Sequence, residues 1–193
     1  MNKLITLKEN KTLTLGFWIY IMTDLVLFAA LFATYAVLHS HTNGGPMASE
    51  LFKLPVVLLE TVILLTSSFF AGLAYLSAKQ QQASQAFMWL FITGLLGLSF
   101  LALEINEFVQ LANEGLTVTT SAFGSAFFTL VGTHGLHITA GLIWLSAILV
   151  YLYKRGLNDK IFNRILLFTI FWHFLDMVWI FIFSFVYLMG VIS

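Results

Sequence analysis

Gly115–Tyr153 reads GLTVTTSAFGSAFFTLVGTHGLHITAGLIWLSAILVYLY, which is 39 residues without a formal charge. A helix needs about 20 predominantly apolar residues to cross the hydrocarbon core of a bilayer. The segment is long enough to cross it, and we expect a membrane-spanning helix at 122–153. Its only basic side chains are His134 and His137.

Four other stretches of the chain satisfy the same length criterion. We expect further spans at 15–38, 54–78, 86–108 and 161–192. The connections between the five spans are short, as in bundles of helices that are neighbours in space. The sequence therefore predicts an all-α integral membrane bundle of five transmembrane helices, with residues 1–193 forming a single membrane domain.

The composition agrees with this class and excludes others. Hydrophobic residues make up 60% of the chain and charged residues only 9%, whereas a soluble domain has about 25% charged residues. The formal net charge is zero, so nothing favours a nucleic-acid partner. The absence of cysteine excludes disulfides and thiolate metal sites.

The distribution of Lys and Arg predicts the orientation. Eight of the nine cations lie in the N-terminal segment, in the second loop or in the fourth loop with its flank: Lys3, Lys8, Lys11, Lys79, Lys154, Arg155, Lys160 and Arg164. Five spans place these three regions on one side, and Lys53 on the other. Because cytoplasmic loops carry the excess of Lys and Arg, we expect a cytoplasmic N-terminus and a periplasmic C-terminus.

Small residues on two of the predicted spans indicate close helix packing. Gly132, Gly135 and Gly141 lie in the span at 122–153, and Gly94 and Gly97 lie in the span at 86–108. Small residues let the backbones of neighbouring membrane helices approach one another. We therefore expect these two helices to pack closely against their neighbours.

Several ionisable side chains lie within the spans or at their edge: Asp24, Glu60, Glu104, Glu107, His134, His137, His173 and Asp176. Placing any one of these side chains in lipid in its ionised form would cost several kcal/mol of free energy. We therefore expect them to face the bundle interior or water. The helical rise places Asp24 on the cytoplasmic side, the histidines and Asp176 near mid-membrane, and Glu60 and Glu104 nearer the outer face. They form a predicted intramembrane polar network, structural or proton-related.

The spacing within this set leaves more than one role open. His134 and His137, Glu104 and Glu107, and His173 and Asp176 are each three residues apart, on one helix face. Hydrogen bonds that hold helices together are the ordinary role of such groups, and the last pair could also share a proton. The pairs lack the Glu-x-x-His signature of di-iron bundles. We assign no catalytic, cofactor-binding or metal-binding residue.

Three functional alternatives remain open on the residues alone. The first is a stand-alone membrane metalloenzyme. The second is haem ligation, for which His134 and His173 have comparable depth. The third is a proton-coupled transporter. Transporters often have an inverted repeat and spans broken by Gly and Pro near the middle, and the sequence shows neither feature.

A series of ordered motifs resembles subunit III of the haem–copper terminal oxidases. They are GFWIY (16–20), TDLVLF (23–28), LET (59–61), EINEF (104–108), GTHGLH (132–137) and WHFLDMVW (172–179). The resemblance covers the chain from Leu15 to Gly190. Asp24 takes the place of the buried acid that is Glu in many members of the family.

The five-span form resembles the quinol oxidase branch of that family. FATYAVL (32–38), GGP (44–46) and YLMG (187–190) are most similar to subunit III of the bo-type (cytochrome o) ubiquinol oxidases. EINEF (104–108) is also similar to menaquinol oxidases, so the resemblance leaves the quinol open.

The resemblance implies an accessory subunit of a proton-pumping quinol oxidase in a bacterial inner membrane. In that family subunit III carries no redox centre, because the haems and copper lie in subunit I and the quinol is the substrate of the complex. The implied partners are subunit I as main contact, subunits II and IV, and structural phospholipid. The implied role is to stabilise subunit I and to assist proton uptake, without catalysis by subunit III itself.

Overall fold

A computed structural model describes residues 2–39, 54–119 and 121–192 of the chain, with side chains for 12–39, 54–119 and 121–190. Its elements are α1 (Asn2–Leu38), α3 (Leu54–Lys79), α4 (Ala83–Asn113), α5 (Ala122–Arg155), α6 (Asp159–Ile182), the π-helical segment η1 (Phe183–Leu188) and α7 (Met189–Ile192). Five helices are long and apolar enough to cross a membrane, and the described residues include no strand. The predicted all-α class with five spans is confirmed. The GGP motif at 44–46 and Lys53 lie outside the described residues.

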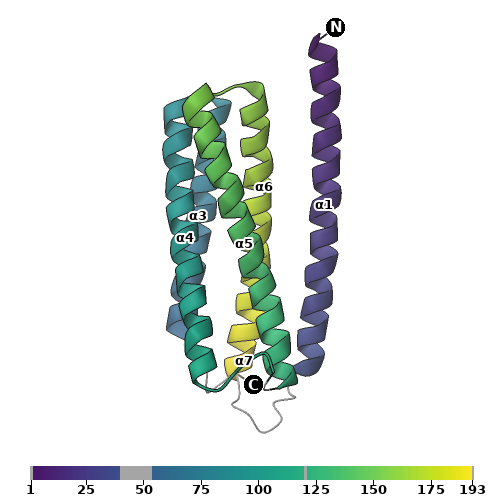
Figure 1. The fold of residues 1–193 in the computed structure, drawn as a ribbon, viewed down its shortest axis with the longest axis vertical. Helices are drawn as coiled ribbons and strands as arrows, with labels where there is room; N and C mark the ends of the chain where they lie inside the picture. Colours follow the sequence, from purple (N-terminus) through teal and green to yellow (C-terminus); the bar gives the residue numbers. More distant parts are fainter. Residues whose placement is uncertain (1, 40–53, 120, 193) are drawn as a thin grey trace.

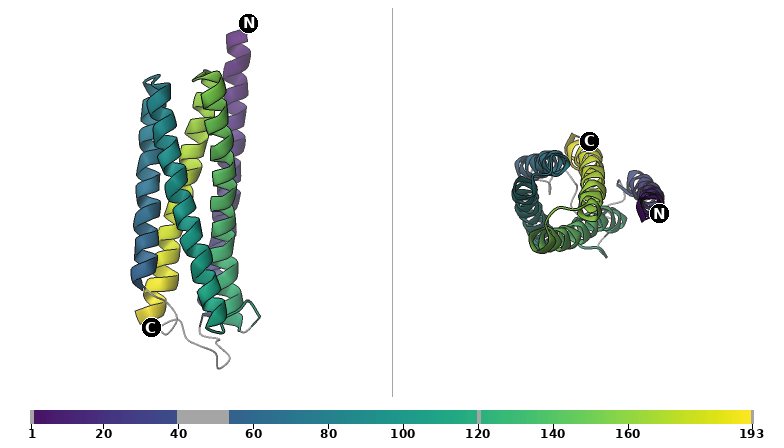
Figure 2. Two further views of the ribbon diagram at one scale, coloured as in Figure 1. Left: turned by 60° about the vertical axis from the view of Figure 1, so that its left-hand side comes forward. Right: turned by 90° about the horizontal axis from the view of Figure 1, so that it is seen from above.

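Four of the five long helices form a ring, and α1 stands outside it. Seen from above, α3, α4, α5 and α6 follow one another around the ring, and α1 lies against α5 and α6 (Figure 2). The buried side chains of α1 are few and include Ile21, Asp24, Phe28 and Tyr35. Their spacing of three, four and seven residues puts them on one helix face. A single narrow stripe therefore attaches α1 to the bundle.

The two ends of the bundle differ in charge. The first turns of α1, the end of α3, the end of α5 and the start of α6 lie together at the upper end in Figure 1. The described cations at this end include Lys79, Lys154, Arg155 and Lys160. The structure thus gathers residues that the sequence places on one side of the membrane. Which compartment this end faces remains a prediction.

The helix ends follow ordinary capping chemistry. Ser121 Oγ accepts a hydrogen bond of 3.0 Å from the Gly124 backbone N–H at the start of α5, and Asn158 Oδ1 accepts one of 3.0 Å from Ile161 at the start of α6. Gly156 ends α5 with a φ of 65°, which favours glycine. The connection between α5 and α6 is thus shorter than the loop expected at 154–160. At the other end of the chain, α1 extends well before residue 15.

Trp172 joins all four helices of the ring. Its indole N–H donates to Ser67 Oγ of α3 over 3.0 Å. A Cβ added to Gly97 of α4 would lie 2.8 Å from the Trp172 ring, and one added to Gly141 of α5 would lie 2.9 Å from it. No larger residue fits at either glycine without displacing the ring. The expectation of close helix packing is confirmed at these positions.

The last membrane span is not a regular α-helix. Residues 183–188 form a π-helical segment, η1, between α6 and α7. A π segment adds a residue to one turn and so rotates the side chains that follow it. Tyr187 lies in this segment and is completely buried. This interruption is not visible in the sequence, because the segment contains neither Pro nor Gly.

Candidate functional site

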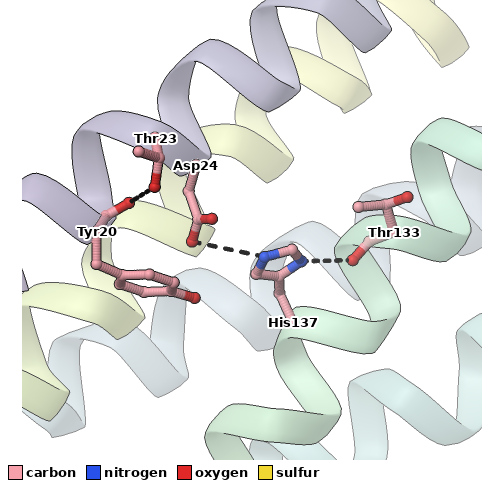
Figure 3. Close-up of polar contacts among 5 residues, drawn as sticks. All are labelled: Tyr20, Thr23, Asp24, Thr133 and His137. Carbon is pink, nitrogen blue, oxygen red and sulfur yellow. Dashed lines mark hydrogen bonds and ion pairs between the residues drawn. The ribbon is translucent and has the colours of Figure 1, made fainter.

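Asp24 and His137 connect α1 to α5. His137 Nε2 lies 3.5 Å from Asp24 Oδ2, and this is an ion-pair contact (Figure 3). On the other side of the ring, His137 Nδ1 donates to the Thr133 carbonyl over 2.8 Å. Asp24 is 6% exposed and lies on the narrow buried stripe of α1. The contact is therefore a polar attachment point of α1.

The hydrogen bond to Thr133 fixes how the His137 ring faces Asp24. Because the Thr133 carbonyl can only accept, Nδ1 of His137 carries a hydrogen. Nε2 then faces Asp24 either as the second N–H of an imidazolium beside a carboxylate, or as an acceptor beside a protonated acid. Either arrangement of this one proton gives an attractive contact between α1 and α5.

Aromatic rings surround the pair. The Phe28 ring lies 5.3 Å from the His137 ring, measured between centroids. The Tyr20 ring lies alongside Asp24 (Figure 3). Thr23 donates to the Tyr20 carbonyl over 2.7 Å, so its hydroxyl is directed to the backbone rather than to the carboxyl group. The Tyr20 phenol interacts electrostatically with Asp24, while the apolar Phe28 ring strengthens the interaction between Asp24 and His137.

A second polar cluster contains three acids on α3 and α4. Glu60, Glu104 and Glu107 are 0%, 2% and 9% exposed. Glu60 interacts electrostatically with Glu107, and Glu104 with both of them, so the structure brings these three predicted residues together. A Cβ added to Gly135 of α5 would lie 2.8 Å from Glu104 Oε1. Glycine at 135 therefore allows this carboxyl group to reach the surface of α5.

Tyr187 completes the acid cluster, and the sequence did not predict its role. Its hydroxyl donates to Glu107 Oε2 over 2.9 Å. The π-helical segment places Tyr187 in the interior, so a regular helical pattern does not reveal it. On the same side, the Trp179 indole donates to Thr61 Oγ1 over 3.1 Å. Both hydrogen bonds join the last span to its neighbours.

His134 has a structural environment. It is completely buried, and its ring stacks on Trp179 at 5.2 Å between centroids. Phe100 meets the His134 ring edge-on at 6.0 Å. Neither ring nitrogen has a hydrogen-bond partner among the described residues. Although His134 and His137 share a helix face in sequence, the first enters the aromatic core and the second pairs with α1.

His173 differs from the expectation for the polar set. It is exposed on the surface of the chain rather than enclosed in the bundle. Asp176, three residues later, is 8% exposed and lies near Ser68 of α3. No ion pair joins His173 to Asp176 within the described part of the chain. Regular helix geometry keeps the two on one face, where Asp176 interacts electrostatically with His173.

These arrangements join the helices through polar contacts. Among the residues that the structure describes, no group of three or more His, Cys, Asp or Glu side chains could hold a metal ion. The two polar clusters instead consist of carboxyl, imidazole and phenol groups set among aromatic side chains.

Comparison with known proteins places these features in a family. The family described as cytochrome c oxidase subunit III matches residues 3–191. The chain is 54% identical to the cytochrome bo(3) ubiquinol oxidase subunit 3 of Pseudomonas aeruginosa, covering 91% of this chain and 84% of the relative. It is 48% identical to the quinol oxidase subunit 3 of Bacillus subtilis, covering 91% and 86%. It is also 48% identical to the cytochrome c oxidase subunit 3 of Bacillus sp. (strain PS3), covering 96% and 89%.

Proposed function

This chain belongs to the cytochrome c oxidase subunit III family, and we propose that it is the accessory third subunit of a bacterial quinol oxidase. The observation that carries the proposal is its similarity, over more than nine-tenths of its length, to the third subunits of two quinol oxidases. One of them is named for ubiquinol, which favours ubiquinol as the substrate of the complex. The five membrane-spanning helices agree with a multi-pass protein of the bacterial inner membrane.

Within such a complex the chain is a non-catalytic subunit. Oxidation of the quinol and reduction of O2 to water require haem and copper, which we place in subunit I. Subunit I is the proposed main contact, and subunits II and IV are the other proposed partners. The family assignment favours this role over a stand-alone metalloenzyme or a transporter.

We also propose that the chain binds phospholipid. A cleft of about 530 Å³ opens between α1 and the last span. Its walls include Phe32, Ala33 and Ala36 of α1, with Phe181 and Phe185 opposite. Pockets of roughly 300–1,000 Å³ accommodate most of a drug-sized molecule, so one acyl chain is a suitable occupant. A lipid in this cleft would support α1, which only a narrow stripe attaches to the bundle.

A contribution to proton uptake is the third part of the proposal. The Asp24–His137 pair can hold one proton, and Asp24 lies near the middle of the apolar part of α1, which runs from Thr12 to Leu38. With the cation-rich end in the cytoplasm, as the cations predict, protons taken up from that side would reach the pair at mid-membrane. It would act as a reservoir rather than as a redox site.

Deletion of the subunit tests the main proposal. The oxidase should be purified with and without this chain, and quinol oxidation should be followed until activity is lost. We expect the core without the chain to begin turnover with substantial activity and to inactivate several-fold faster, because the support for subunit I is missing. Equal durability of the two preparations would contradict the stabilising role. Purification of the tagged chain without any haem-containing partner would contradict membership of the complex.

A further inference from the structure

His173 is exposed at the middle of the last membrane span. The span runs from Asp159 to Leu188, so His173 lies 14 residues from one end and 15 from the other. At 1.5 Å per residue it is about 21 Å along the helix from either end. Histidines at this depth almost always face the bundle interior, a water-filled cavity or a polar partner. Facing only lipid, the imidazole would lack a partner for its polar edge.

The unpaired edge of this imidazole is a hydrogen-bond acceptor. His173 Nδ1 donates to the Thr169 carbonyl over 2.7 Å, which leaves the lone pair of the neutral ring on Nε2. His137 is held in the same way by Thr133, and its Nε2 meets Asp24 on another helix. No described residue takes the corresponding place opposite His173.

Polar neighbours lie beside His173. Asp176, which interacts electrostatically with His173, and Ser68 are buried and lie close to each other. A Cβ added to Gly72 of α3 would lie 4.0 Å from the His173 ring, so the glycine leaves space beside the ring. Met177, one turn after His173 on the same face of α6, is 55% exposed. We call the surface formed by these five residues the α3–α6 face.

We propose that the α3–α6 face is the docking surface for a transmembrane helix of another oxidase subunit, which donates a hydrogen bond to Nε2 of His173. The inference rests on the proposed membership of an oxidase complex. A donor fits better than a second acceptor, because Nε2 and Asp176 Oδ1 both accept. Gly72 allows the partner helix to approach closely, as small residues do in membrane helix pairs.

Lipid does not supply this donor. The hydrocarbon core is about 30 Å thick, so the headgroups lie about 15 Å from its middle. Acyl chains have no hydrogen-bond donors. A polar side chain on a helix that crosses the bilayer can present a donor at this depth, and the proposal commits to that occupant.

Site-specific photo-crosslinking in the intact complex tests the docking surface. His173 is replaced by the photoreactive residue p-benzoylphenylalanine, and membranes containing the assembled oxidase are irradiated. Leu136 of α5, which is 71% exposed and lies near the middle of its own span, is the matched control position. We expect an adduct between position 173 and a co-purifying oxidase subunit, at several-fold higher yield than from position 136. An equal or lower yield, a lipid adduct alone or an adduct with a second copy of this chain would overturn the proposal.

A pair of substitutions tests the hydrogen bond separately. His173→Gln keeps an acceptor, whereas His173→Leu removes it and leaves an apolar side chain. Interhelical hydrogen bonds in membranes contribute about 0.6–2 kcal/mol, which corresponds to about a three- to thirtyfold change in dissociation. We expect His173→Leu to dissociate from the complex in detergent faster by such a factor, and His173→Gln to behave more like the unchanged chain. Unchanged dissociation of His173→Leu would overturn the hydrogen bond.

The outcomes separate this inference from the proposed function. If haem co-purifies with the chain but position 173 forms no protein adduct, the docking surface is wrong and the subunit assignment stands. If haem does not co-purify with the unchanged chain, the assignment itself is wrong.

Discussion

His137 and His173 show how one local arrangement acquires two uses. Each imidazole donates from Nδ1 to the carbonyl four residues earlier, so each presents Nε2 away from its own helix. His137 meets Asp24 of α1, and the contact joins two helices of the same chain. Nε2 of His173 makes no hydrogen bond with a described residue, and the side chain lies on the surface. The hydrogen bond from Nδ1 is the same in both histidines, so the group opposite Nε2 determines the role. With a partner in the same chain the histidine stabilises the fold, and without one its Nε2 is available to another chain.

Two substitutions of Asp24 distinguish its structural role, the attachment of α1 to α5, from a role in proton exchange. In Asp24→Asn the side-chain amide can still donate to Nε2 of His137, so the link to α5 is kept while the titratable group is lost. Asp24→Leu removes both. We expect Asp24→Asn to retain thermal stability and to slow proton uptake by the oxidase. We expect Asp24→Leu to lose in addition about 1–2 kcal/mol of stability, because a buried imidazole edge is left unpaired.

The measurements for these variants are proton uptake by the reconstituted oxidase and the midpoint of thermal inactivation. Unchanged uptake in Asp24→Asn would leave Asp24 with a structural role only. Equal stability of the Asn and Leu variants would show that the contact with His137 does not hold α1.

The residue types of the candidate site could be predicted from the sequence, but their partners could not. Acids and histidines inside apolar spans are visible without a structure, since they interrupt uncharged stretches. Which side chains pair depends on the rotation of each helix and on which helices are neighbours. The spacing of residues along one helix gives no information about either. Spacing along one helix suggested His173 with Asp176, which interact electrostatically, but it could not show that His137 meets Asp24 of another helix. Tyr187 was missed because the π segment that turns it inward has no Pro or Gly to mark it.

Among the helices, α1 is attached differently from the rest. α3, α4, α5 and α6 each pack against two neighbours in the ring, while α1 lies outside it against α5 and α6. The polar attachment of α1 is the Asp24–His137 pair near the middle of its apolar part, and the cleft opens beyond it toward the end of the helix. A molecule that fills the space beside α1 would therefore stabilise its attachment to the bundle. Hydropathy predicted that α1 crosses the membrane but not that it stands apart, because lipid-facing and protein-facing apolar residues look alike in sequence.

Filling the cleft tests the proposed lipid. Ala33→Phe places an aromatic ring in the space between α1 and the last span. Ala30→Phe, also on the exposed surface of α1 but not among the residues that line the cleft, is the matched control. We expect Ala33→Phe to lower the ratio of phospholipid to haem in the purified complex and to shorten its lifetime in turnover. Mass spectrometry of extracted lipid measures the ratio, and equal ratios in the two variants would contradict lipid binding in this cleft.

The charged groups of the whole molecule are divided between its two ends and its interior. The ends carry the Lys and Arg residues, strongly biased to one end, and the interior carries acids and histidines in small clusters. The bias of Lys and Arg toward one end can be predicted from the sequence alone, because the order of the spans determines the side on which each loop lies. The arrangement of the interior groups cannot be predicted in this way, since five helices can be packed in many ways that satisfy the same hydropathy.

Reporter fusions test the predicted orientation of the whole molecule. Eight of the nine Lys and Arg residues lie on the side of the N-terminus, and cytoplasmic loops retain such cations. We therefore expect alkaline phosphatase, which is active only in the periplasm, to be active when fused after Ser193. A green fluorescent protein fused at the same position should be dark, and one fused before Met1 should fluoresce. Replacing Lys154, Arg155 and Lys160 together with Gln should reduce the bias and produce a mixture of orientations, whereas Lys53→Gln should not. An inactive phosphatase combined with bright fluorescence at the C-terminus would reverse the assignment.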